Sequence, residues 1–200
     1  MTEHKASWRL YFKDQMKARA TNPLSIQESQ LKNNLRAFLA PQSGNWATYY
    51  ALPGEPPAES VLDFSESILG VCEETTQIKS WAFPKVSGER LSFYRIKSKT
   101  DLCAGPFGIL EPNNSCQKVD LSDLNGILIP GLGFDRKGTR LGRGKAFYDK
   151  TLDQYDGIKA GVAWSFQVTE EELPKESTDI QMDVVISDRG IQWFSGRREV

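Results

Sequence analysis

The residues best suited to chemistry lie in one glycine-rich stretch, residues 130–149, which reads PGLGFDRKGTRLGRGKAFYD. We call this stretch the basic segment. Five glycines fall within residues 131–144, and six lysines and arginines fall within 136–150. Glycine lets backbone amides approach a ligand closely, and cationic side chains neutralise negative charge. Together, ahead of a short helix expected from about 145 to 153, they predict an anion site, most often for phosphate.

Two standard nucleotide motifs do not fit the basic segment. A Walker A loop needs four residues between its glycines, but five separate Gly138 from Gly144, and Ala146 replaces the hydroxyl residue that holds magnesium. No G-x-G-x-x-G pattern occurs. Two other interpretations remain open: a solvated basic turn with structural glycines, and nucleic-acid binding. Cationic and aromatic side chains interleave at residues 143–148, which favours nucleic acid, whereas an isoelectric point of 6.0 opposes it.

The basic segment follows the clearest strand of the sequence, residues 125–130 (NGILIP). Its continuous aliphatic run suits a strand that is buried on both faces of a sheet. In an open α/β sheet, ligands bind beyond the carboxyl ends of the strands. The segment therefore begins where a binding site is expected.

Helices and strands alternate along the rest of the chain. Two helices open it: 5–20, where Trp8, Phe12 and Met16 form one stripe, and 25–40, which begins with a capping box. A third helix is expected at 60–72 and a Gly/Pro-rich loop at 104–112. The other expected strands are 45–52, 80–83, 91–96, 158–163, 182–187 and an edge strand at 191–194. The alternation predicts one α/β domain over residues 1–200, a Rossmann-like three-layer sandwich with a largely parallel sheet flanked by helices.

The overall charge hides an uneven distribution. The net charge of the 200 residues is −1, but residues 1–36 carry seven basic and three acidic side chains, and residues 131–150 carry six and two. The remainder is acidic. An apolar fraction of 39% and a charged fraction of 26% are ordinary for a soluble globule and exclude a collagen, a membrane protein or a mostly disordered chain.

Cysteine and histidine usage narrows the chemistry further. Cys72, Cys103 and Cys116 form no CxxC pair, so we expect free thiols rather than a disulfide framework or a zinc ribbon. The single histidine, His4, lies at the start of the sequence, which argues against a histidine zinc site and a Ser-His-Asp triad, so we expect any metal to be held by oxygen atoms. The sequence has no apolar leader and no 18-residue apolar run, which predicts a cytoplasmic protein without a membrane partner.

The basic segment resembles the signature of the 5-formyltetrahydrofolate cyclo-ligase family. Further matches fall in the family's order: Lys5-xxx-Arg9, Leu52-Pro53-Gly54-Glu55, residues 107–112 (FGILEP) and Met182-Asp183. The resemblance covers nearly all of residues 5–187. It departs at Ala146, where the family usually has glycine, and at Phe147, where it usually has tyrosine.

The resemblance implies an enzyme that uses ATP and Mg²⁺ to convert 5-formyltetrahydrofolate, which can be polyglutamylated, to 5,10-methenyltetrahydrofolate. It implies that Lys145 and Arg143 are catalytic and neutralise the transferring phosphoryl group. The implied ATP-binding residues are Lys5, Arg9, Arg140, Leu141, Gly142, Arg143, Gly144, Lys145, Ala146, Phe147 and Tyr148. Without the resemblance, Lys5 and Arg9 would be interpreted as a solvated helix face.

The resemblance also implies the folate and metal contacts. Folate would be bound by Glu55, Tyr50, Phe107 and Tyr148, and Mg²⁺ by Asp149 and Asp183. Simpler roles stay open for four of these residues: an exposed turn residue for Glu55, core packing for Tyr50, a pair with a nearby lysine for Asp149, and a turn cap for Asp183. Trp81, Trp164 and Trp193 are expected to pack in the core or at a sheet edge.

Three other functions are weighed against this one. The first is a non-catalytic module of the same fold that holds folate or a nucleotide. The second is a protein that binds RNA through the basic segment, and the third is a sugar-phosphate or CoA enzyme on a similar scaffold. We favour the enzyme, acting as a monomer and without a nucleic-acid partner.

Overall fold

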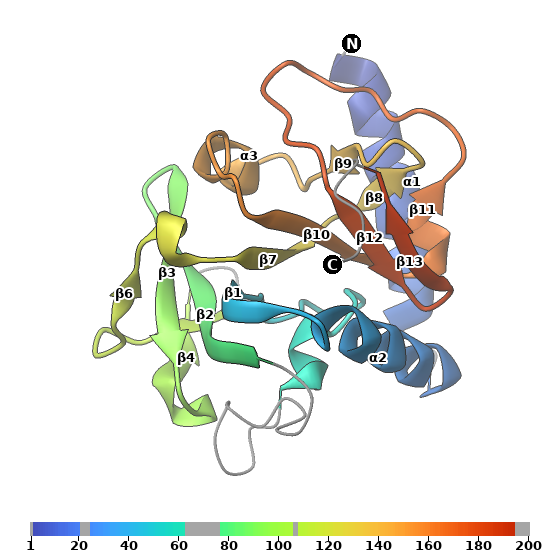
Figure 1. The fold of residues 1–200 in the computed structure, drawn as a ribbon. Helices are drawn as coiled ribbons and strands as arrows, with labels where there is room; N and C mark the ends of the chain where they lie inside the picture. The colour runs from blue at the N-terminus through green and yellow to red at the C-terminus, as the bar shows by residue number, and fades with distance from the viewer. Residues whose placement is uncertain (1, 21–24, 63–76, 106–107, 195–200) are drawn as a thin grey trace.

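The computed structural model describes residues 2–20, 25–62, 77–105 and 108–194. An eight-stranded sheet forms the centre of the molecule (Figure 1), in the order β13-β12-β10-β7-β1-β2-β3-β6. The strands are β1 (Ser43–Ala47), β2 (Gln77–Ser87), β3 (Arg90–Ile96), β6 (Lys118–Val119), β7 (Gly126–Pro130), β10 (Ile158–Ala163), β12 (Val184–Ser187) and β13 (Gly190–Trp193). The five strands from β12 to β2 run parallel, and the strands beyond them are antiparallel.

The central strand β7 is buried on both faces, as its aliphatic run predicts. Leu128 packs with Leu31 and Leu35 of α2 (Ser25–Leu39) on one face. Ile127 and Ile129 pack with residues that follow α3 (Phe147–Thr151) on the other face. Alternate side chains along a strand point to opposite faces, so the sheet is covered on both faces. The expected α/β architecture with a largely parallel sheet is confirmed.

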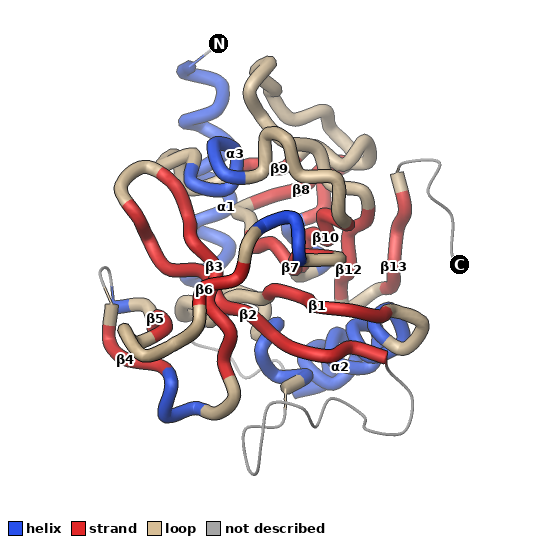
Figure 2. The backbone as a smooth tube through the Cα atoms, turned by 60° about the vertical axis from the view of Figure 1, so that its left-hand side comes forward, coloured by secondary structure: helices blue, strands red, loops and turns tan. Residues whose placement is uncertain are grey.

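Helix α1 (Thr2–Ala20) packs against the basic segment rather than flat on the large sheet (Figure 2). Its expected apolar stripe is present: Phe12 is fully buried, Met16 is buried and Trp8 is half-buried, next to Leu132 and Leu141. The approach is close, because a Cβ at position 133 would collide with the ring of Phe12. Glycine at 133 is therefore required by helix packing.

The basic segment forms a small sheet of its own. Strands β8 (Gly133–Asp135), β9 (Arg140–Leu141) and β11 (Val168–Thr169) are joined in the order β11-β8-β9, and η5 (Ser165–Gln167) precedes β11. The buried carboxylate of Asp135 closes the hairpin, because its Oδ1 accepts the N–H groups of Lys137 (2.8 Å) and Thr139 (2.9 Å). The first half of this glycine-rich segment is thus a hydrogen-bonded hairpin.

Several expected boundaries were wrong. The strand expected at 45–52 ends at Ala47, and residues 48–52 form a loop that leads to the Pro53-Gly54 turn. Strand β2 is longer than expected because it pairs along seven residues with β3 in a hairpin. Within 60–72, the described part is the end of η1 (Ala58–Val61) and Leu62. The remainder of the expected helix, with Cys72, lies outside the described residues.

The expected Gly/Pro-rich loop contains a short antiparallel pair, β4 (Leu102–Ala104) with β5 (Leu110–Pro112). Two short turns of 3₁₀ helix, η2 (Lys99–Asp101) and η4 (Leu121–Asp123), complete the fold. Cys103 and Cys116 are free thiols, as expected. Trp81 and Trp164 are buried, which confirms their expected role in the core. None of the described helices is long and apolar enough to cross a membrane.

Candidate active site

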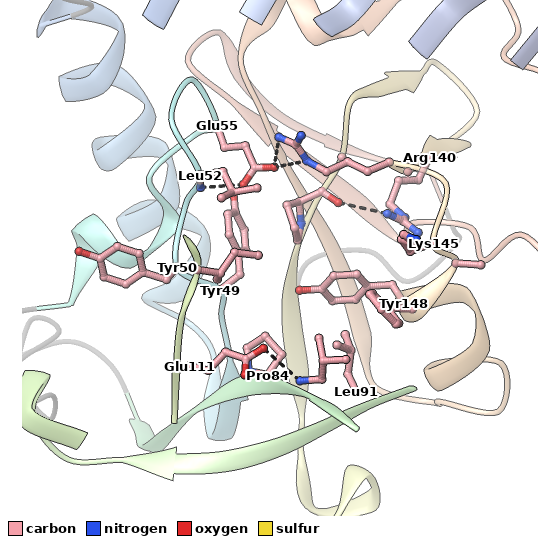
Figure 3. A pocket seen from close by; sticks show the side chains of 18 of the residues that line it. Tyr49, Tyr50, Leu52, Glu55, Pro84, Leu91, Glu111, Arg140, Lys145 and Tyr148 are labelled. Carbon is pink, nitrogen blue, oxygen red and sulfur yellow. Dashed lines mark hydrogen bonds and ion pairs between the residues drawn. The ribbon is translucent and has the colours of Figure 1, made fainter. Parts of the chain in front are cut away.

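A cavity of about 400 Å³ opens beyond the carboxyl ends of β1 and β7. Pro130 and Gly131 follow β7, and Tyr49 and Tyr50 lie on the loop after β1. The β2–β3 hairpin closes the opposite side (Figure 3). Ligands are expected at this edge of an open α/β sheet. The lining residues are Tyr49, Tyr50, Leu52, Glu55, Pro84, Val86, Leu91, Ile109, Leu110, Glu111, Pro130, Gly131, Arg140, Gly142, Arg143, Lys145, Ala146, Phe147 and Tyr148.

Arg143 and Glu55 meet at the charged end of the cavity. Glu55 Oε1 accepts hydrogen bonds from Arg143 Nε (2.8 Å) and Nη2 (2.7 Å), and Glu55 Oε2 accepts the N–H of Leu52 (2.9 Å). Glu55 is buried, whereas 41% of the Arg143 side chain is exposed. A buried carboxylate held by its own turn thus positions a solvent-facing guanidinium. The interpretation of Glu55 as an exposed turn residue was wrong.

Arg140 takes a different position from Arg143, because it is buried. Its Nη2 donates to both carboxylate oxygens of Asp149 (3.0 and 2.9 Å), and its Nη1 donates to the carbonyl of Pro130 (3.2 Å). Its guanidinium carbon lies 5.5 Å from the centre of the Tyr148 ring, a cation–π distance. Within the described part of the chain, its buried Nε has no hydrogen-bond partner. Arg140 therefore ties the basic segment to α3 under the cavity.

Lys145 is exposed and lines the cavity. Its ammonium group makes no hydrogen bond or ion pair with any residue that the structure describes. Gly144 before it and Ala146 after it both have positive φ, +103° and +54°. An ammonium group without a protein partner, on a segment that turns this sharply, is available to an anionic ligand.

The left-handed backbone at Ala146 explains why glycine is usual at this position in the family. A residue with a Cβ in this region costs about 1 kcal/mol relative to glycine. Glycine, the residue usual in the family, would adopt this conformation without that cost. The methyl group of Ala146 is thus accommodated in an unfavourable conformation at the cavity wall.

Arg9 and Lys5 share one face of α1 but take different partners. Arg9 Nε donates to the carbonyl of Gly142 (3.1 Å), which places it beside the exposed part of the basic segment. Lys5 is buried and pairs with Asp179 (2.6 Å) and Glu176 (3.1 Å). The cavity lining does not include Lys5. The interpretation of Lys5 as part of a solvated helix face was wrong.

The two carboxylates expected to bind magnesium do not face one cavity. Asp149 pairs with Arg140, not with a lysine. Asp183 accepts the N–H of Lys159 (2.8 Å), lies 3.4 Å from Lys159 Nζ, and lines a separate hollow. In the described residues, no group of three histidine, cysteine or acidic side chains is arranged to hold a metal. The described part of the protein therefore offers carboxylates but no assembled metal cage.

The aromatic residues expected to bind folate are partly assembled. Tyr50 and Tyr148 both line the cavity. Burial raises the pKa of the Tyr148 hydroxyl well above its usual value, so the group is neutral and can donate a hydrogen bond. Phe107 lies outside the described residues. Tyr50 also packs against the core, so its two interpretations are compatible.

Three features of the lining were missed from the sequence. Tyr49 lines the cavity while its hydroxyl donates to the carbonyl of Pro56 (2.7 Å). The β2–β3 hairpin supplies an apolar wall, and Glu111 places a buried carboxylate at that wall. The FGILEP match contains Glu111, and this match was the available signal.

A second acidic residue supports the loop that carries Glu55. Glu59 Oε2 accepts the N–H of Ala51 (3.3 Å), and burial raises the pKa of Glu59 to about 7. The nearby charge of Glu55 acts in the same direction. Glu59 is therefore held in a site that disfavours its charged form.

The sequence and the fold both match known proteins. A model of the 5-formyltetrahydrofolate cyclo-ligase family matches residues 3–188. A Haemophilus influenzae 5-formyltetrahydrofolate cyclo-ligase is 27% identical over 165 residues, which cover 80% of this chain and 84% of that one. A probable 5-formyltetrahydrofolate cyclo-ligase of Schizosaccharomyces pombe is 30% identical over 125 residues, which cover 54% of this chain and 61% of the relative.

Among solved structures, the Aquifex aeolicus 5,10-methenyltetrahydrofolate synthetase is similar along almost its whole length. It superposes with a TM-score of 0.76 at 30% sequence identity, covering 98% of this chain and 95% of that one. A Mycoplasma pneumoniae 5,10-methenyltetrahydrofolate synthetase, at 22% identity and a TM-score of 0.67, shares the fold. The family match spans the cavity and the whole basic segment, and the chain therefore belongs to the 5-formyltetrahydrofolate cyclo-ligase family.

Proposed function

We propose that this protein is an ATP-dependent ligase that cyclises 5-formyltetrahydrofolate to 5,10-methenyltetrahydrofolate and releases ADP and phosphate. The observation that carries the proposal is the pair of solvent-facing cations, Arg143 and Lys145, at the mouth of a cavity with apolar and aromatic walls. Such a cavity suits a substrate with a flat ring system that reacts with a triphosphate.

The chemistry requires activation of a poor leaving group. The formyl oxygen attacks the γ-phosphorus of ATP, so that a P–O bond forms to the formyl group and the P–O bond to ADP breaks. The N10 nitrogen then attacks the formyl carbon, the bond from that carbon to the phosphorylated oxygen breaks, phosphate leaves, and the N10 proton passes to solvent. Phosphoryl transfer of this kind needs mainly positioning and charge neutralisation.

The charged end of the cavity can supply both the positioning and the charge neutralisation that phosphoryl transfer needs. Lys145 would neutralise the transferring phosphoryl group directly. Arg143, held by Glu55, would donate hydrogen bonds from its planar guanidinium group to the oxygen atoms of that phosphoryl group. Arg9, beside Gly142, extends the positive surface toward the nucleotide. The other expected ATP contacts, at residues 141–148, would be made by backbone amides and by the aromatic pair at 147–148.

Two other residues expected to bind ATP, Arg140 and Lys5, are already engaged in ion pairs with carboxylates of the protein. Arg140 is already paired with Asp149, so we propose that it positions the basic segment and adds positive potential beneath the phosphates. Lys5 would have to exchange Asp179 for a phosphate oxygen before it could reach a nucleotide. On the folate side, Tyr50 and Tyr148 would pack against the pteridine ring. Glu55 retains lone pairs that can accept an N–H group of that ring.

We propose that Mg²⁺ binds to the protein together with ATP. Mg²⁺ commonly takes one or two carboxylates, with substrate phosphates and water filling its other positions. This coordination fits the described residues, which form no assembled metal cage. Asp149 and Asp183 are the proposed carboxylates, and each would have to share its oxygen atoms with a cationic partner. When bound, the ion would supply charge neutralisation to the phosphates.

The proposal is tested by mixing the protein with Mg-ATP and 5-formyltetrahydrofolate and following the near-ultraviolet absorbance of the methenyl product. Product should form with ATP and fail to form when ATP is omitted. Calorimetric titration with 5-formyltetrahydrofolate alone separates binding from turnover. Binding without ATP-dependent product, from a folded sample, would identify a non-catalytic folate-binding module and sink the proposed activity.

A further inference from the structure

The cavity contains a second buried carboxylate that the chemistry above does not use. Glu111 lies in β5 and is 5% exposed, yet it lines the cavity. Figure 3 shows it at the end of the cavity opposite Glu55, beside Pro84 and Leu91. A buried acidic side chain in an apolar wall is costly unless hydrogen-bond donors compensate it.

The protein compensates Glu111 only in part. Its Oε1 accepts the N–H of Val86 (3.2 Å) from the neighbouring strand β2. No ion pair involving Glu111 occurs within the described residues, and the three cations of the lining belong to residues 140–145 at the far end. Its Oε2 is thus left for a donor that the described part of the protein does not supply.

The chain is shaped to keep this carboxylate in place. A Cβ at position 105 would lie 2.7 Å from Glu111 Cδ and 2.8 Å from its Oε2, so glycine there gives the carboxylate room. Lys85, next to Val86, is engaged elsewhere: its Nζ donates to the carbonyl of Pro112 (3.0 Å) and to Asn114 (2.9 Å). The local backbone therefore fixes Glu111 without neutralising it.

Glu55 is in a different situation. Its Oε1 already accepts two hydrogen bonds from Arg143, and its Oε2 accepts one from Leu52. Removing Glu55 would disturb the position of Arg143 as well as any contact that Glu55 makes with the folate. Of the two carboxylates, Glu111 is the one that lines the cavity with an oxygen atom that accepts no hydrogen bond from the described residues.

We propose that Glu111 binds the aminopyrimidinone edge of the pteridine ring and makes the cavity selective for 2-amino-4-oxo-pteridines. That edge presents two adjacent donors, the N3–H and the 2-amino group, and a carboxylate accepts such a pair with parallel hydrogen bonds. Apolar walls at Pro84, Leu91 and Ile109 would enclose the flat ring. This assignment rests on the proposed function, and it directs the N5 formyl group toward the charged end.

Binding of 5-formyltetrahydrofolate, measured by calorimetry without ATP, tests the proposal. In Glu111→Gln, Oε1 can still accept the Val86 N–H, but the amide group then opposes the donors of the ligand. We expect its dissociation constant to rise about 10- to 100-fold, with KM for ATP changed less than about twofold. Glu89→Gln is the matched control, because it removes an exposed carboxylate from the same hairpin outside the cavity lining.

A second measurement needs no variant. The 2-desamino analogue of 5-formyltetrahydrofolate lacks one of the two donors, so the wild-type protein should bind it about tenfold more weakly. Glu111→Gln should discriminate less than about threefold. Equal binding of both ligands by the wild-type protein, or unchanged folate binding by Glu111→Gln, would overturn the assignment and leave Glu111 a structural role.

The outcomes also separate this inference from the proposed function. A protein that binds 5-formyltetrahydrofolate through Glu111 but forms no methenyl product with ATP would overturn the proposed activity and leave the inference standing. A protein that forms the product with Glu111→Gln as efficiently as with the wild type would support the activity and overturn the inference. A wild-type protein that does not bind the folate overturns both.

Discussion

The two halves of the basic segment, residues 131–141 and 142–148, differ in burial and in what they contact. Residues 131–141 are largely buried: Leu132 and Phe134 are fully enclosed, and Leu141 is 2% exposed. In residues 142–148, Arg143, Gly144, Lys145 and Ala146 are all exposed. The first half forms a hairpin between α1 and the large sheet, and the second half borders the cavity.

The contrast shows that a shared sequence pattern does not imply a shared role. Gly131 lies against the ring of Phe134, where a Cβ would be 2.6 Å from its edge, whereas Gly144 has the positive φ of a sharp turn. Arg140 is buried in an ion pair, whereas Arg143 faces solvent. The first half is therefore part of the packed core, and the second half lines the cavity where we propose that the ligands bind.

The largest expected effect concerns the buried half. Phe134 packs against Gly131 and Gly161, and it does not line the cavity. Phe134→Ala should lower the free energy of unfolding by about 3–5 kcal/mol, because it leaves a large void in a packed core. Urea denaturation measures this, with Leu10→Ala on the exposed face of α1 as the control. A variant as stable as the wild type but inactive would break the comparison.

Lys145 gives the reciprocal test. Lys145→Ala should reduce kcat about 100- to 1,000-fold, because a charge that stabilises the transferring phosphoryl group is lost. The free energy of unfolding should change by less than about 0.5 kcal/mol, as for other exposed substitutions. Lys150→Ala removes a nearby cation that pairs with Glu89 instead, and should retain activity. Comparable losses of turnover and stability in Lys145→Ala would mean that the second half is structural too.

The third prediction concerns Glu59, which supports the loop that carries Glu55, and it addresses how the stability of the protein depends on pH. The pKa of Glu59 is about 7 in the folded protein against 4.5 for the free side chain, so its ionisation opposes folding as pH rises from 4.5 to 7. Glu59→Gln should therefore unfold like the wild type near pH 4.5 and be about 1–3 kcal/mol more stable at pH 8. Thermal unfolding at both pH values measures the difference. A variant that is less stable at pH 8 would contradict the assignment.

The smallest expected effect concerns Ala146. Ala146→Gly should stabilise the protein by about 0.5–1 kcal/mol, because glycine adopts the left-handed conformation without strain. Ala6→Gly, at an exposed position of α1, should have the opposite sign and a similar size. Urea unfolding of the two variants side by side measures both. Destabilisation by Ala146→Gly would show that the methyl group packs favourably enough to offset the strain.

Much of the fold could be predicted from local patterns. The aliphatic run of β7, the apolar stripe of α1 and the alternation of helices and strands each depend on residues close in sequence. Boundaries were missed where partners are distant: β2 begins at Gln77 because it pairs there with Ser43 of β1, and residues 48–52 leave the sheet to form part of the cavity wall.

The amino-acid composition of the basic segment predicted which residues carry the charge, but it did not predict which residues contact one another. The cluster of Arg143 and Lys145 was visible as charge, but the pairing of Lys5 with Asp179 joins residues 174 positions apart. The roles of Gly131 and Gly133 depend on the rings of Phe134 and Phe12, which no local pattern locates. Glu111 was overlooked because a single acidic residue acquires its meaning from the apolar wall around it.

The docking of α1 has a consequence for the order in which the chain assembles. The buried side chains of this helix contact Leu132, Leu141 and Leu173, and Lys5 pairs with Asp179, all of which lie far from the helix in the sequence. Non-local contacts of this kind are closed late, because chain entropy must be lost before they form. Helix α1 is therefore expected to dock late in folding, and until then its apolar stripe stays exposed and able to associate with other apolar surfaces.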